Sequence, residues 1–236
     1  MAVDDSYTKA LLHMDGSDGS TTFTDESGKT WTANGNAQID TAQSKFGGAS
    51  GLFDGSGDYI DTPDHADFNV GSDNFTIDCW FKKAANNVTY CLFGQCDSAA
   101  TDTTVSFVLK ANQDGAGNHP YCAVYTGSTV KDITSSVAVT DGGWHHIAMV
   151  RNGNTMTLYL DGTSVGTVDI TGVTVNNSAN KPTIGRVGEL SAQFYNGWID
   201  EFRFSKGIAR WTANFTPPTS AYAPPSSGGI GFFPFF

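Results

Sequence analysis

The sequence has little positive charge and no long apolar run, and each shortage excludes a class of partner. Its 236 residues carry 13 lysines and arginines against 24 aspartates and glutamates, so the formal net charge is -11. This charge repels phosphate backbones and anionic membrane surfaces. No stretch approaches the roughly 20 apolar residues of a membrane-spanning helix. We therefore expect neither a nucleic-acid partner nor a membrane span.

We expect no secretory signal peptide either. The opening residues, MAVDDSYTKALLHMDG, place two aspartates where a signal peptide carries positive charge. The apolar run ALLHM is too short for the core of such a signal. The sequence therefore predicts a protein that is made in the cytoplasm and is either assembled there or exported by a route that the sequence does not show.

Cysteine is scarce, with only Cys79, Cys91, Cys96 and Cys122. A chain of this length buries a sizeable core without disulfides, so we expect reduced and buried thiols. A zinc site is the alternative, but the Cys91 to Cys96 spacing is longer than the usual ligand pair. No histidine follows at zinc-finger spacing either.

The apolar period of 3.6 residues that a substantial helix requires is also absent, although KGIARWTANF could hold one helical turn. Period-two alternation is frequent instead. In NFTIDCWFKK it places Phe75, Ile77, Cys79 and Phe81 on one face of a strand. Together with 27 glycines and recurring turn signals, this predicts about a dozen short strands and an all-β antiparallel β-sandwich.

Residues 141–170, DGGWHHIAMVRNGNTMTLYLDGTSVGTVDI, show the pattern most clearly. Asn-Gly and Asp-Gly adopt positive φ at low cost, so two tight hairpins join three strands into a meander. The neighbours His145 and His146 face opposite sides of their strand and cannot bind one ion together. We expect one histidine to be packed and the other to lie at the surface.

The composition changes at Thr216. The segment TPPTSAYAPPSSGG is rich in proline, serine and glycine and predicts an extended linker. We therefore divide the chain into a domain at 1–215 and an irregular tail at 216–236. The tail ends in five residues that would be a solubility liability in water. We slightly favour docking of this end on another subunit over docking on the chain's own sandwich. The residues that would dock are Phe232, Phe233, Pro234, Phe235 and Phe236.

Four phrases between about residue 8 and residue 218 carry a family resemblance. They are LLHMDGSDGSTTFTDESGKTW, SKFGGASGLFDGSGDYIDTPDHADFNVGSDNFTIDCWFK, DGGWHHIAMVRNGNTMTLYLDG and GWIDEFRFSKGIARWTANFTPP. Together they resemble the laminin G-like branch of the concanavalin A-like lectin/glucanase superfamily, which implies a jelly roll. Freestanding domains with this N-terminal phrase also look like structural proteins of tailed bacteriophages, which implies a place on a virion surface.

The resemblance makes an enzyme one of the functions to consider, because the glucanases of this superfamily carry the catalytic pattern Glu-x-Asp-x-x-Glu on one strand. This sequence lacks that pattern. Asp200 and Glu201 are adjacent, so we expect them on opposite faces of a strand, with Glu201 in solvent and Asp200 in a turn or metal site. Asp78 stands alone. We therefore predict that the chain is not an enzyme.

A structural calcium ion is the cofactor that the resemblance implies, tying an early loop to a late strand. Asp25 and Asp200 match that site best, and Asp15 lies in another acidic turn. Hard oxygen ligands of this kind suit Ca²⁺. In the alternative, which stays open, these acids cap turns through local hydrogen bonds.

Aromatic rings are the platforms on which sugars stack, and Trp31, Tyr195 and Trp211 are the candidates for a glycan site. Our main prediction is a non-enzymatic structural or adhesion module, a virion decoration or tail-fibre protein that its tail attaches to protein subunits of an assembly. Surface glycans are a further partner expected for this module. A freestanding carbohydrate-binding lectin is the alternative. A glycoside hydrolase is the third.

Overall fold

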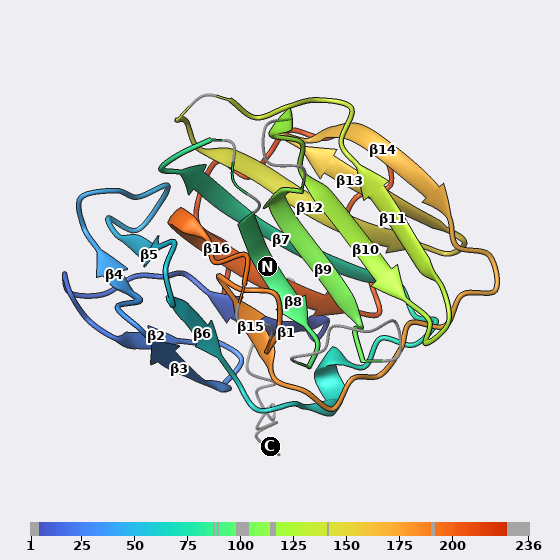
Figure 1. Cartoon of the computed structure of the whole chain (residues 1–236), viewed down its shortest axis with the longest axis horizontal. Helices are drawn as coiled ribbons and strands as arrows, with labels where there is room; N and C mark the ends of the chain where they lie inside the picture. The colour runs from blue at the N-terminus through green and yellow to red at the C-terminus, as the bar shows by residue number, and fades with distance from the viewer. Residues whose placement is uncertain are drawn as a thin grey trace, which may run out of the picture.

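The computed structural model describes residues 5–86, 88, 90–97, 104–113, 117–140, 142–189 and 192–225. The predicted partner-binding residues, Phe232, Phe233, Pro234, Phe235 and Phe236, lie outside this range. Within it the chain forms two antiparallel sheets packed face to face, which confirms the predicted sandwich (Figure 1). The described residues contain no α-helix, and none of their helical segments is long and apolar enough to cross a bilayer. The helical turn considered for KGIARWTANF is not formed.

The first sheet has the strand order β14-β13-β12-β7-β16-β5-β4, and β1 also pairs with β16. Its strands are β1 (Thr8–Leu12), β4 (Gln38–Asp40), β5 (Ser50–Asp54), β7 (Phe75–Lys83), β12 (His145–Asn152), β13 (Thr155–Leu160), β14 (Thr163–Asp169) and β16 (Asn196–Lys206). The long β16 lies at the centre because one part of it pairs with β5, another with β1, and β7 pairs with most of its length.

The second sheet has the order β11-β10-β9-β8-β15-β6-β3-β2. Its strands are β2 (Thr22–Thr24), β3 (Thr30–Asn34), β6 (Tyr59–Asp61), β8 (Tyr90–Gln95), β9 (Phe107–Asn112), β10 (Tyr121–Tyr125), β11 (Val130–Thr134) and β15 (Pro182–Ile184). In Figure 1 the strands β8 to β11 lie over β12 to β14 of the first sheet. A short 3-10 helix, η1 (Ala66–Phe68), follows β6.

The core lies between the two sheets and consists of the residues that point inward, which alternate with outward residues along each strand. Phe75, Ile77, Cys79 and Phe81 of β7 all belong to it, as their spacing predicted. All four cysteines are buried, as expected, and no disulfide joins any of them. The predicted meander is present as β12, β13 and β14, and Gly153 takes positive φ in its first turn.

A β-bulge in β16 overturns the expected placement of Glu201. The register between β16 and β7 shifts between Asp200 and Arg203, and Glu201 has a φ of 51°. Ile199 and Phe202 both belong to the core, so the bulge places two consecutive residues, Asp200 and Glu201, between two inward ones. They do not lie on opposite faces, and both are fully buried rather than one being in solvent.

The chain after β16 returns across the outer face of the first sheet, and we call residues 207–225 the C-terminal strap. Phe215 donates its N–H to the Gly162 carbonyl (2.9 Å). Its ring packs with Trp211 against Tyr159. Tyr222 lies 7% exposed on the same face. Tyr222, which lies beyond the boundary predicted at residue 215, therefore packs on the chain's own sandwich, whereas most of the residues around it are exposed.

Candidate functional site

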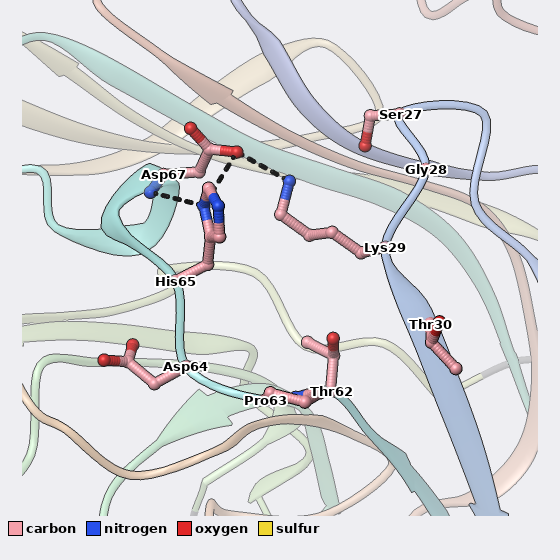
Figure 2. A pocket seen from close by; sticks show the side chains of 9 residues that line it. All are labelled: Ser27, Gly28, Lys29, Thr30, Thr62, Pro63, Asp64, His65 and Asp67. Carbon is pink, nitrogen blue, oxygen red and sulfur yellow. Dashed lines mark hydrogen bonds and ion pairs between the residues drawn. The ribbon is translucent and has the colours of Figure 1, made fainter.

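A pocket of about 350 Å³ opens where the turn between β2 and β3 faces the segment that joins β6 to η1 (Figure 2). Its volume falls within the usual range for small-ligand sites, about 300–1,000 Å³. Serine, threonine, aspartate, lysine and histidine side chains dominate its walls. The lining residues are Ser27, Gly28, Lys29, Thr30, Thr62, Pro63, Asp64, His65 and Asp67.

An ion pair joins the two walls of the pocket. The Lys29 ammonium lies 2.7 Å from the Asp67 carboxylate and also donates to the Lys9 carbonyl on β1. Burial raises the pKa of Asp67, but the hydrogen bond and the charge of Lys29 outweigh it and hold that pKa below its ordinary value. The Asp67 carboxylate is therefore ionised at neutral pH, and its bond to Lys29 connects η1 to β1 and to the start of β3.

Histidine and aspartate side chains edge the same pocket. His65 exposes 58% of its side chain, and its Nδ1 lies 3.1 Å from both the Asp67 N–H and an Asp67 carboxylate oxygen. A neutral ring accepts from the N–H and caps η1, whereas a protonated ring pairs with the carboxylate. Asp64 accepts a hydrogen bond from Gln95 (2.9 Å). Oriented donors and acceptors beside a partly exposed ring suit a ligand rich in hydroxyl groups.

The aromatic residues predicted to bind glycans lie elsewhere. Trp31 is 5% exposed and donates from its indole to Asp25, while Tyr195 is fully buried and donates its hydroxyl to the Lys82 carbonyl. Trp211 stacks on Phe215 at 4.0 Å within the strap. Neither buried ring is open to a sugar, because both face the core. The sequence analysis did not identify the pocket residues, because they come from two separate segments and neither segment contains a tryptophan, tyrosine or phenylalanine that would indicate a sugar site.

Asp25, the first predicted calcium ligand, has both carboxylate oxygens occupied. One oxygen accepts from the Leu11 N–H (3.0 Å) and from the backbone and hydroxyl of Ser27 (2.7 and 2.6 Å). The other accepts from the Trp31 indole (3.1 Å). Four hydrogen-bond donors surround this carboxylate. It therefore stabilises the turn after β2, and it has no oxygen left to coordinate a cation.

Asp200 has a different environment. One oxygen accepts from the N–H groups of Lys45 (2.7 Å) and Phe46 (3.1 Å), while the other is buried without a hydrogen bond. Burial, with the nearby charges of Glu201 and Asp15, raises the pKa of Asp200 to about 7. A Cβ at Gly47 would overlap the Asp15 carboxylate, so the loop that caps Asp200 also contacts Asp15. The described residues contain no group of three metal-binding side chains.

A buried network of charged groups lies beneath the strap. Arg203 donates to both oxygens of Asp78 (3.0 and 2.9 Å), and the Tyr222 hydroxyl donates to Asp78 at 2.6 Å. His146 lies 3.0 Å from the same hydroxyl. His146 is fully buried and His145 only partly, which matches the prediction of one packed histidine. Asp78 itself is fully buried.

Glu201 belongs to the same covered face. It accepts from the Tyr222 N–H (2.8 Å), and its other oxygen lies 2.8 Å from His13 Nδ1. With Asp78 and Asp200, it is one of the three acids weighed as catalytic, and all three are fully buried. None of them lines the pocket around Lys29, His65 and Asp67.

Comparison with known proteins agrees with this fold. A family described as the concanavalin A-like lectin/glucanases superfamily matches residues 54–210, more than half of the chain. A search of curated proteins gave no match.

Solved structures show the same architecture. The binding domain of Paraclostridial Mosquitocidal Protein 1 superposes with a TM-score of 0.64 at 16% identity, over 86% of this chain and 50% of that one. The binding domain of botulinum neurotoxin DC in complex with SialylT gives 0.64 at 15%, over 87% and 50%. The same domain in complex with rat synaptotagmin II gives 0.66 at 16%, over 87% and 50%. The chain thus spans about half the length of these structures.

At such low identity these likenesses concern the fold, and the family match concerns the sequence itself. The two agree on one architecture. The chain belongs to the concanavalin A-like lectin/glucanases superfamily.

Proposed function

We propose that the chain is a non-enzymatic carbohydrate-binding module whose ligand occupies the pocket around Lys29, His65 and Asp67. The observation that carries this proposal is the composition of the pocket, in which hydroxyl, carboxylate and ammonium groups surround one half-exposed imidazole. Such groups complement the alternating donors and acceptors of a sugar. The burial of Asp78, Asp200 and Glu201 supports the absence of hydrolysis.

The solved structures support a binding role over the alternatives. One similar domain, that of botulinum neurotoxin DC, was solved both with SialylT and with rat synaptotagmin II. These facts belong to those proteins, but they favour the lectin alternative over the virion role. The virion surface and the docking of the tail on another subunit remain predictions, since no finding bears on the source of the chain.

Substitution of His65 tests the pocket. Asparagine also caps helix N-termini, so His65→Asn keeps the cap of η1 while it removes the imidazole surface. We expect the affinity for a bound oligosaccharide, identified on a glycan array and measured by calorimetry, to fall about tenfold, which corresponds to about 1.4 kcal/mol.

Lys131→Gln on β11, at the far edge of the same sheet, is the control and should leave the affinity unchanged. Equal affinities of wild type and His65→Asn would place the glycan elsewhere. Binding of no oligosaccharide by the folded wild type would contradict the proposed function.

We further propose that a calcium ion, as the family implies, is held by Asp200 and Asp15 and not by Asp25. The buried Asp200 oxygen without a hydrogen bond supports this choice. The positive charge of the ion would stabilise the ionised forms of these two acids, which burial disfavours. We expect millimolar CaCl₂ to raise the melting temperature of the wild type but not of Asp200→Asn, with MgCl₂ as the control. An unchanged melting temperature with calcium and with chelator would refute the site.

A further inference from the structure

Arg186 is the arginine whose role the fold does not explain. Of the four arginines, Arg203 and Arg210 pair with carboxylates, and Arg151 donates to backbone carbonyls. Within the part of the chain that the structure describes, the Arg186 side chain makes no hydrogen bond or ion pair, and its buried Nε has no acceptor. Its backbone carbonyl accepts from the Thr183 hydroxyl (2.8 Å). In a chain with almost twice as many acids as bases, an arginine without a carboxylate partner points to a ligand.

Aromatic rings hold this guanidinium in place. It lies 3.6 Å from the centroid of the Tyr59 ring, and the Phe194 ring lies 6.5 Å from Tyr59 at an angle of 34°. Tyr195 donates its N–H to the Gly185 carbonyl (2.8 Å), which joins the residue after Phe194 to the residue before Arg186. The neighbouring Gln193 also has a buried side-chain oxygen without a partner. A stacked guanidinium keeps its in-plane donors, which match the geometry of an oxyanion.

The outer face of β3 and β6 connects this cluster to the pocket. Trp31 and Ala33 pack on the core, so Thr30, Thr32 and Asn34 face outward. Thr30 lines the pocket at one end of β3. Asn34, at the other end, pairs with Tyr59 of β6. Four residue steps along a strand cover about 13 Å, a length that suits a short oligosaccharide lying across the face.

We propose that this face binds an oligosaccharide carrying one anionic group, with its carboxylate or sulfate on Arg186 and its neutral sugars extending toward the pocket. The inference rests on the proposed function and specifies its ligand. The net charge of -11 repels ligands with many negative charges. A single anionic group on an otherwise neutral chain avoids that repulsion and satisfies the one guanidinium.

Calorimetry with three oligosaccharides of equal length, one neutral, one carboxylated and one sulfated, tests the inference. We expect the wild type to bind one acidic form about tenfold more tightly than the neutral form, because hydrogen bonds between charged groups exceed neutral ones. Arg186→Gln should abolish this preference and keep neutral binding. Arg186→Lys should restore part of it, since lysine keeps the charge but lacks the fork.

Lys131→Gln removes the same charge at the far edge of the sheet and should leave the preference intact. Melting temperatures confirm that each variant is folded. Neutral binding without an acidic preference would overturn this inference and leave the proposed function standing. A preference that survives Arg186→Gln would overturn it as well. If the folded wild type bound no oligosaccharide, both this inference and the proposed function would be contradicted. The comparison of the carboxylated with the sulfated oligosaccharide identifies the preferred anionic group.

Discussion

Replacement of Asp78 by alanine should lower the free energy of unfolding by about 3–5 kcal/mol, the cost of leaving a buried charge without its partner. Asp78 is fully buried and Arg203 is 9% exposed, and two hydrogen bonds join them. The substitution also leaves the Tyr222 hydroxyl without its acceptor. Denaturant unfolding at neutral pH measures the loss.

Two further variants identify the cause. Asp132→Ala removes an exposed acid from β11 and should change stability by no more than about 0.5 kcal/mol. The double variant Asp78→Leu with Arg203→Met removes both charges and should be more stable than Asp78→Ala alone. A loss below about 1 kcal/mol for Asp78→Ala would contradict a structural role for the pair.

The pair also sets the direction of a pH dependence. Burial raises the pKa of Asp78, but the charge of Arg203 and the nearby His146 ring, whose Nε2 lies 3.5 Å away, outweigh it and hold that pKa below its ordinary value. A depressed folded-state pKa means that the stabilisation is present above the unfolded value, about 3.9. It is lost as the pH falls through the folded value. Asp78→Ala should therefore lose less stability on acidification than the wild type.

Removal of the Tyr222 side chain should be similarly costly. Tyr222→Ala deletes a ring that lies 3.9 Å from the Arg203 guanidinium, with its hydroxyl bonded to Asp78. We expect a loss of about 3–5 kcal/mol, as for other large buried aromatic residues. The strap should also detach more often, so limited proteolysis should cut between residues 216 and 222 faster than in the wild type.

Tyr222→Phe provides the matched control, because it keeps the ring and removes only the hydroxyl. Its loss should be about 1–3 kcal/mol, the cost of a missing buried hydrogen bond to a charged group. A proteolysis rate equal to that of the wild type in Tyr222→Ala would show that the strap is held by Trp211 and Phe215 instead.

The sequence predicted those parts of the fold that depend on local pattern. Alternation identified the core face of β7, and Asn-Gly and Asp-Gly located the turns of the meander. Alternation misled at Glu201, because a bulge adds one residue to the strand and a single sequence does not reveal where this happens. Trp31, on β3, and Tyr195, directly before β16, are not glycan platforms, because an aromatic residue in or beside a strand packs inward as readily as outward.

The pocket and the strap depend on contacts between distant segments. Lys29 and Asp67 are 38 residues apart and meet only when β3 and β6 pair. Tyr222 sits among prolines, where composition predicts an unattached linker, yet its hydroxyl finds a buried carboxylate 144 residues earlier. Long-range partners of this kind have no local signature.

The anchoring of Tyr222 has a mechanical consequence for anything attached beyond residue 225. Tension applied there reaches Tyr222 before it reaches β16, and Tyr222 is bonded to Asp78 on β7 and to Glu201 on β16. These strands lie in the middle of the first sheet. The load would therefore enter the domain at its centre, through side chains, instead of peeling an edge strand away.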